Sequence, residues 1–82
     1  MIFTDIIMPD GKKRFFFLDE TAKSKEVIKE LKAEYGEIGG ETFLLFEDRT
    51  GRILDEKETL LAQKITSGCR LRLARNAALS AG

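Results

Sequence analysis

The chain has 82 residues, of which 43% are hydrophobic and 34% are charged, so it can build one small hydrophobic core and is neither disordered nor collagen-like. Its 14 Lys and Arg residues cancel its 14 Asp and Glu residues. Without net charge there is no global field to attract nucleic acid or an anionic membrane, and we expect neither as a partner.

The start of the chain predicts a β-hairpin. Residues 2–8 are rich in isoleucine, and residues 15–18 form a second apolar run. The sequence Pro-Asp-Gly at 9–11 lies between them and is a strong turn signal, because proline presets φ and glycine supplies a positive φ. Two short apolar runs around such a turn are typical of paired antiparallel strands.

A helix is predicted next. Thr21 or Ser24 can serve as its N-cap, and Gly36 is its natural stop because a left-handed residue often ends a helix. Its apolar positions fall on one stripe over about three turns. They are Val27, Ile28, Leu31 and Tyr35.

The second half predicts short strands joined by turns. Residues 43–46 form a third strand, 48–51 a turn, and 52–54 a short fourth strand. Residues 69–74 form a half-buried last strand, since leucines alternate there with arginines. Residues 76–82 are small and mostly apolar and are expected to form a flexible tail.

These elements predict an α+β fold, in which a mixed sheet of four or five strands packs on one helix. We expect the first and last strands to lie side by side in the middle of the sheet. Residues 1–75 would form the domain, and residues 76–82 the tail.

The pattern as a whole resembles ubiquitin and its relatives, the β-grasp superfold. The resemblance covers nearly the whole chain and implies the same α+β architecture. Besides the turn at 9–11, it is carried by Val27, Leu31, Gly36, Leu44, Leu45, Phe46, Gly51, Leu54, Leu60, Ile65, Leu71 and Leu73.

Within that superfold, residues 3–8 and 65–71 look like the bacterial YukD/EsaB branch, whose members are small ubiquitin-like proteins associated with the type VII (WXG100) secretion machinery. The resemblance implies a cytoplasmic, non-catalytic accessory protein without a cofactor, with secretion-machinery proteins as partners. The branch usually stops near the last strand, whereas residues 76–82 run on here.

The alternative is a ubiquitin-like modifier or sulfur carrier that is activated at its C-terminus. Such proteins need a flexible tail ending in Gly-Gly, because any Cβ would clash in the narrow channel of the activating enzyme. Here the last residues are Ser80, Ala81 and Gly82, and the pair Gly39-Gly40 is internal. The tail therefore favours the accessory protein.

The outer face of the sheet is the candidate binding site. The family pattern implies that Phe16 and Leu18 point towards the helix, so that period two turns their neighbours outwards. A one-residue shift of that strand would instead bury Phe15 and Phe17, and a tail or loop could also cover the face. The predicted surface, for a protein partner or a second copy of the chain, comprises Phe3, Phe15, Phe17, Phe43, Leu45, Arg70 and Arg72.

No catalytic or metal site is expected. The chain has no histidine and a single cysteine, Cys69, so a zinc site is disfavoured and a His-dependent nucleophile is excluded. We interpret Cys69 as structural, the basic run 12–14 as a solvated loop tip, and the acidic residues at 55–58 as a solvated loop. No apolar run approaches the roughly 20 residues of a membrane-spanning helix, so direct membrane insertion is not expected.

Overall fold

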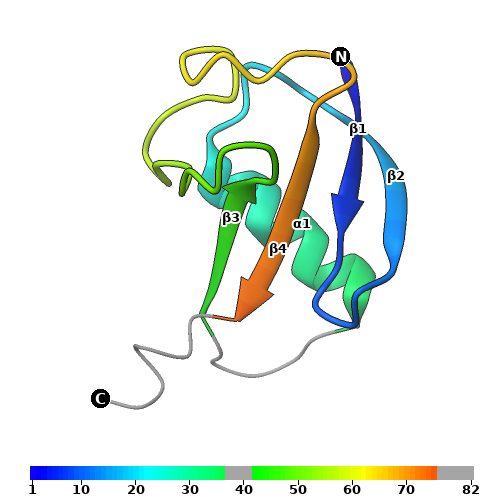
Figure 1. Cartoon of the computed structure of the whole chain (residues 1–82). Coiled ribbons are helices and arrows are strands. Elements are labelled where there is room, and N and C mark those ends of the chain that lie inside the picture. Colours follow the sequence, from blue (N-terminus) through cyan, green and yellow to red (C-terminus); the bar gives the residue numbers. More distant parts are fainter. Residues whose placement is uncertain (37–41, 76–82) are drawn as a thin grey trace.

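A four-stranded mixed sheet packs on one helix (Figure 1). The computed structural model describes residues 1–36 and 42–75, so the predicted tail and the glycine pair at 39–40 lie outside the described residues. The elements are β1 (Ile2–Ile7), β2 (Lys13–Leu18), α1 (Ser24–Tyr35), β3 (Phe43–Glu47) and β4 (Arg70–Arg75).

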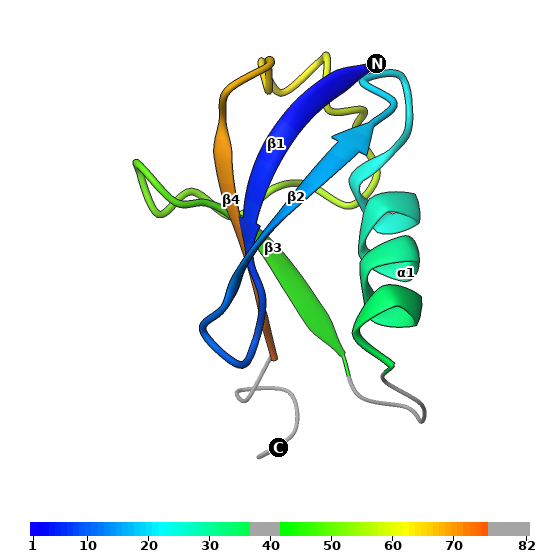
Figure 2. The same cartoon turned by 90° about the vertical axis from the view of Figure 1, so that its right-hand side faces the viewer.

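The order of the strands is β2-β1-β4-β3, so the first and last strands are central, as the sequence predicts. β1 pairs with β2 and β3 pairs with β4 in the antiparallel sense, whereas β1 and β4 are parallel. The helix covers one face of this sheet, and the opposite face has no helix over it in the described part of the chain (Figure 2). We call that opposite face the outer face.

The predicted hairpin turn is confirmed. Gly11 has a φ of +84°, and its N–H donates to the carbonyl of Met8 over 2.8 Å. The N–H of Met8 in turn donates to the carbonyl of Lys12 over 2.9 Å. Glycine is needed here because a side chain rarely adopts this left-handed backbone.

The two ends of α1 are stabilised differently. Its C-terminus is as predicted, because Gly36 has a φ of +83° and its N–H donates to the carbonyl of Ala33 over 3.2 Å. The predicted N-cap is wrong: the N-cap residue is Lys23, and its side chain makes no cap hydrogen bond. Instead, the free N–H of Ser24 donates to the carbonyl of Glu58 over 3.0 Å, so the loop after β3 replaces the cap.

The core lies between the helix and the inner face of the sheet. Val27, Ile28 and Leu31 are buried, as their helical spacing predicts. Inward side chains of all four strands and of the loop before β4 meet this stripe. They are Ile6, Leu18, Phe43, Leu45, Leu54, Leu60, Ile65, Leu71 and Leu73, with Met8 beside them.

The side chain of Gln63 fastens the loop that precedes β4, a role that the sequence did not reveal. Its Oε1 accepts the N–H of Asp55 over 2.6 Å, and its Nε2 donates to the Oγ of the buried Ser24 over 2.8 Å. The carbonyl of Gln63 also accepts a hydrogen bond from Arg52 over 2.7 Å. One side chain thus ties the loop to the start of the helix.

The predicted strand at 52–54 is not formed. Only an isolated bridge joins Phe46 and Ile53, although the N–H of Leu54 donates to the carbonyl of Leu45 over 2.8 Å. Ile53 is largely exposed, so period two buries only Leu54 of this segment. Because the segment 52–54 buries only one side chain, it does not form a further strand of the sheet.

Candidate functional site

Three phenylalanines form an exposed cluster on the outer face of β1 and β2. Phe3, Phe15 and Phe17 are 45%, 57% and 63% exposed. The rings of Phe3 and Phe15 stack with centroids 5.9 Å apart, and Phe15 meets Phe17 edge-on at 5.4 Å. Phe3 lies directly opposite Phe17 in the β1–β2 ladder. We call these residues the aromatic cluster.

The exposure of the aromatic cluster distinguishes the two orientations considered for β2, with either Phe16 and Leu18 or Phe15 and Phe17 facing the helix. With Phe15 and Phe17 exposed and Leu18 buried, the predicted orientation of this strand holds and the shifted one does not. Phe16 is half-buried and packs against the edge of the core. The placement is settled in this way, while the binding role of the cluster stays a prediction.

The prediction for β3 is wrong by one residue. Phe43 and Leu45 were expected on the outer face, but they are only 2% and 0% exposed and belong to the core. The reason is the pairing with β4: Leu45 lies opposite Leu73, and both point towards the helix. The outer-face positions of β3 are therefore Leu44 and Phe46, which are half-buried.

Arg70 and Arg72 lie on the outer face of β4, as predicted, but they differ in what they contact. Arg72 pairs with Asp48, with 2.9 Å between Nη2 and Oδ1. Arg70 lies next to Asp5 in the β1–β4 register, and its carbonyl accepts the N–H of Asp48 over 3.0 Å, but within the described ranges its guanidinium forms no hydrogen bond or ion pair. Its charge is therefore available to a partner.

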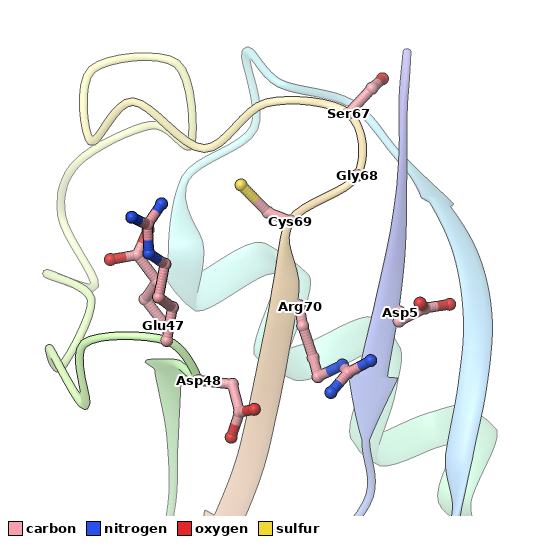
Figure 3. A pocket seen from close by; sticks show the side chains of 8 residues that line it. Asp5, Glu47, Asp48, Ser67, Gly68, Cys69 and Arg70 are labelled. Carbon is pink, nitrogen blue, oxygen red and sulfur yellow. The ribbon is translucent and has the colours of Figure 1, made fainter.

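An open polar pocket adjoins Arg70 where β4 begins (Figure 3). Several of its side chains are already engaged within the chain. The Oγ of Ser67 accepts the N–H of Phe3 over 3.2 Å, and the Sγ of Cys69 accepts the N–H of Thr66 over 3.4 Å. Glu47 accepts the hydroxyl of Thr50 over 2.7 Å. The chain contains no histidine, so neither Ser67 nor Cys69 has the imidazole base of a Ser–His or Cys–His site.

Two carboxyl groups away from the outer face have lowered pKa values. Hydrogen bonds from the hydroxyl and the backbone N–H of Thr21 lower the pKa of Asp19. The ammonium group of Met1, 3.0 Å from the carboxylate, lowers the pKa of Glu20. Asp19 is thus tied to the turn between β2 and α1, and Glu20 joins this turn to Met1.

Within residues 1–36 and 42–75, no cluster of three or more His, Cys, Asp or Glu side chains is placed to hold a metal ion. No helix there is long and apolar enough to cross a membrane.

Comparison with known proteins establishes the fold. No protein-family model matches the chain, and no curated protein matches it. Among solved structures, the chain is similar to a protein designed de novo on the basis of ubiquitin, with a TM-score of 0.76 and 22% sequence identity. The match covers 93% of this chain and 89% of the designed one. The predicted ubiquitin-like β-grasp, α+β fold is thereby confirmed, and at this identity the likeness extends to the fold alone.

Proposed function

We propose that the chain is a non-catalytic protein-interaction module that binds its partner through the outer face of the sheet. The observation that carries this proposal is the aromatic cluster, three rings left exposed on a small domain, of which Phe15 contacts both Phe3 and Phe17. Together they expose roughly 300 Å² of apolar surface, which is the size of patch that often marks a binding site.

The chemistry of the partner follows from the side chains that surround the cluster. Phenylalanine rings favour apolar or aromatic side chains, and arginine is among the residues enriched where binding energy concentrates. Arg70 is exposed and unpaired within the described ranges, so it suits a carboxylate that approaches over β4. The proposed partner segment therefore combines apolar side chains over β1 and β2 with an acidic group over Arg70.

The biological setting that we propose is a bacterial type VII (WXG100) secretion system, with the chain as a cytoplasmic accessory component. The support is the resemblance of residues 3–8 and 65–71 to the YukD/EsaB branch, together with the ubiquitin-like fold. Cytosolic segments of secretion-machinery components are thus the first partners to test.

The competing role is that of a modifier or sulfur carrier. It is distinguished by incubating the chain with ATP and the activating enzymes of its host. A C-terminal adenylate or thioester on Gly82 would replace the accessory role, whereas an unmodified C-terminus supports it.

Binding is tested with Phe17→Ser, because this ring is the most exposed of the cluster. Leu61→Ser is the matched control, since Leu61 is 59% exposed and lies on the loop before β4, away from the outer face. Both variants should fold with stabilities within about 0.5 kcal/mol of the parent. Phe17→Ser should weaken capture of purified secretion components at least about tenfold, or about 1.4 kcal/mol, and Leu61→Ser should not. Equal capture by both variants would contradict the proposal.

A further inference from the structure

The free edge of β2 is a second feature that the proposed function does not use. The N–H of Asp5 donates to the carbonyl of Cys69 over 3.2 Å, and the N–H of Gly68 donates to the carbonyl of Phe3 over 2.9 Å. Odd-numbered residues of β1 therefore turn their backbone groups towards β4, and even-numbered residues turn theirs towards β2. In the β1–β2 register, the even-numbered residues of β1 lie opposite even-numbered residues of β2.

It follows that the backbone groups of Lys13, Phe15 and Phe17 point away from β1, along the edge of the sheet. None of these groups has a hydrogen-bond partner among residues 1–36 and 42–75. The β1–β2 register is unbroken from Ile7–Lys13 to Ile2–Leu18, so no bulge interrupts the edge, and β2 contains no proline. Natural proteins usually protect such an edge with a bulge, a proline, charged side chains or a covering segment. Of these, β2 has charged side chains only at its start, Lys13 and Arg14, and its remaining residues are apolar.

We propose that a second copy of this chain pairs with β2 along this edge, antiparallel and about a two-fold axis at Phe15. Phe15 then lies opposite Phe15 of the second copy, and Lys13 lies opposite Phe17 of the second copy. Each of these pairs joins backbone groups that have no partner in one copy alone. The proposal goes beyond the proposed function because its hydrogen bonds form along the edge of the sheet, with the rings of Phe15 and Phe17 beside the seam on the outer face.

The charges and the length of β2 together select this register. If the copies slid by one pair towards the hairpin turn, Arg14 would face Arg14, and like charges directly opposite each other are destabilising. If they slid the other way, Lys13 would face the opposite charge of Asp19, but Asp19 lies beyond the end of β2, so this pair falls outside the strand. Only the register centred on Phe15 pairs all three outward residues within the strand and places the Lys13 ammonium near an aromatic ring.

The helix side of the same edge is complementary in charge. A hollow between β2 and α1 is lined by Phe16, Leu31, Glu30 and Glu34, among others. In the proposed register, Arg14 of the second copy lies opposite Phe16 and so reaches this acidic hollow. Within one copy, the exposed Arg14 guanidinium lies 3.7 Å from the Glu34 carboxylate, donates to the Glu34 carbonyl over 3.5 Å and lies over the Phe16 ring at 5.5 Å. Such exposed contacts are individually weak, so Arg14 can exchange them for those of a second copy.

Two further properties favour a second copy as the occupant. The formal net charge of the chain is zero, so two copies do not repel each other overall. Continuation of the sheet by antiparallel pairing keeps both helices on one side and both aromatic clusters on the other. The dimer therefore doubles the outer face and leaves it open to a different partner.

The test is sedimentation equilibrium of the full chain from about 10 µM to about 1 mM, a range suited to an interface smaller than the roughly 1,200 Å² of stable complexes. Lys13→Pro removes an outward N–H that the β1–β2 ladder does not use, and Lys13→Ala is its matched control. We expect Lys13→Pro to weaken dimerisation at least about tenfold relative to Lys13→Ala. A chain that stays monomeric throughout the range, or an equal effect of the two variants, would overturn the proposal.

A charge exchange tests the register itself. Arg14→Glu and Glu30→Lys should each weaken the dimer, and the double variant should restore it because the opposite charges meet again. Glu56→Lys, which makes the same charge change on the exposed loop that contacts the start of α1, should leave the dimer unchanged. Failure of the double variant to restore dimerisation, with its circular dichroism spectrum unchanged, would overturn this register. None of these changes touches the aromatic cluster, so the result is independent of the Phe17→Ser binding test.

Discussion

Leu45→Ala is the substitution that tests most directly which residues of β3 are core. Leu45 has no exposed surface and packs within the core cluster, opposite Leu73 on β4. Truncating such a leucine removes buried methyl groups and leaves a cavity, which costs about 2–5 kcal/mol. In a domain of this size each kcal/mol lowers Tm by about 4–8 °C, so we expect a decrease of about 10 °C or more.

Leu44→Ala is the matched control, because Leu44 is the same residue type on the same strand but faces outwards and is half-buried. It should cost about 1 kcal/mol or less. Both free energies are measured by urea unfolding followed by circular dichroism, with m expected to stay constant across the parent and the variants. If Leu44→Ala costs as much as Leu45→Ala, the orientation of β3 described above is wrong and Phe43 and Leu45 return to the candidate surface.

Three further predictions concern the loops. Gln63→Ala should cost about 1–3 kcal/mol in urea unfolding, because it leaves the buried Ser24 hydroxyl and the Asp55 N–H without their partner. Lys64 has a φ of +63°, so Lys64→Gly should be more stable than Lys64→Ala by about 1 kcal/mol, the reverse of the usual order of these residues. The pKa of Asp19 is lower in the folded chain than its unfolded value of about 3.9, so the ionised carboxylate stabilises the fold above that pH. This stabilisation is lost as the pH falls through the folded pKa. Asp19→Asn should therefore lose less stability than the parent in a titration below about pH 4.

The sequence predicted those elements in which the pattern of apolar and polar residues fits only one secondary structure and one buried face. The helix was placed by an apolar stripe that fits only a period of 3.6, and its end by Gly36. The orientation of β4 followed from leucines that alternate with arginines, which leaves no doubt about the buried side. In each case the chemical contrast between neighbouring residues carries the information.

The orientation of β3 could not be predicted for the opposite reason. Its residues 43–46 are all apolar, so period two gives no preference for either face. The choice is made by the pairing of Leu45 with Leu73, a contact between residues far apart in the chain. The N-cap of the helix could not be predicted for a similar reason. Carbonyl groups of the distant loop at 56–58 accept the N–H groups that a local side chain would otherwise cap.

The corrected orientation of β3 changes what the proposed outer face can offer a partner. The sequence predicted one continuous apolar field with two arginines in its middle, but Phe43 and Leu45 belong to the core. The apolar surface is instead concentrated on β1 and β2. Beside it, the Arg70 side chain has no ion pair with any residue of the described ranges, whereas Arg72 is already held by Asp48. Under the proposed function, Arg70→Ala should therefore weaken partner binding more than Arg72→Ala, because only Arg70 gives its charge to the partner without first breaking an ion pair within the chain. Titration calorimetry with a secretion-machinery segment that binds the parent chain measures this difference. An equal loss from the two variants would refute this reasoning, because it would show that the ion pair with Asp48 does not reduce what Arg72 contributes to binding.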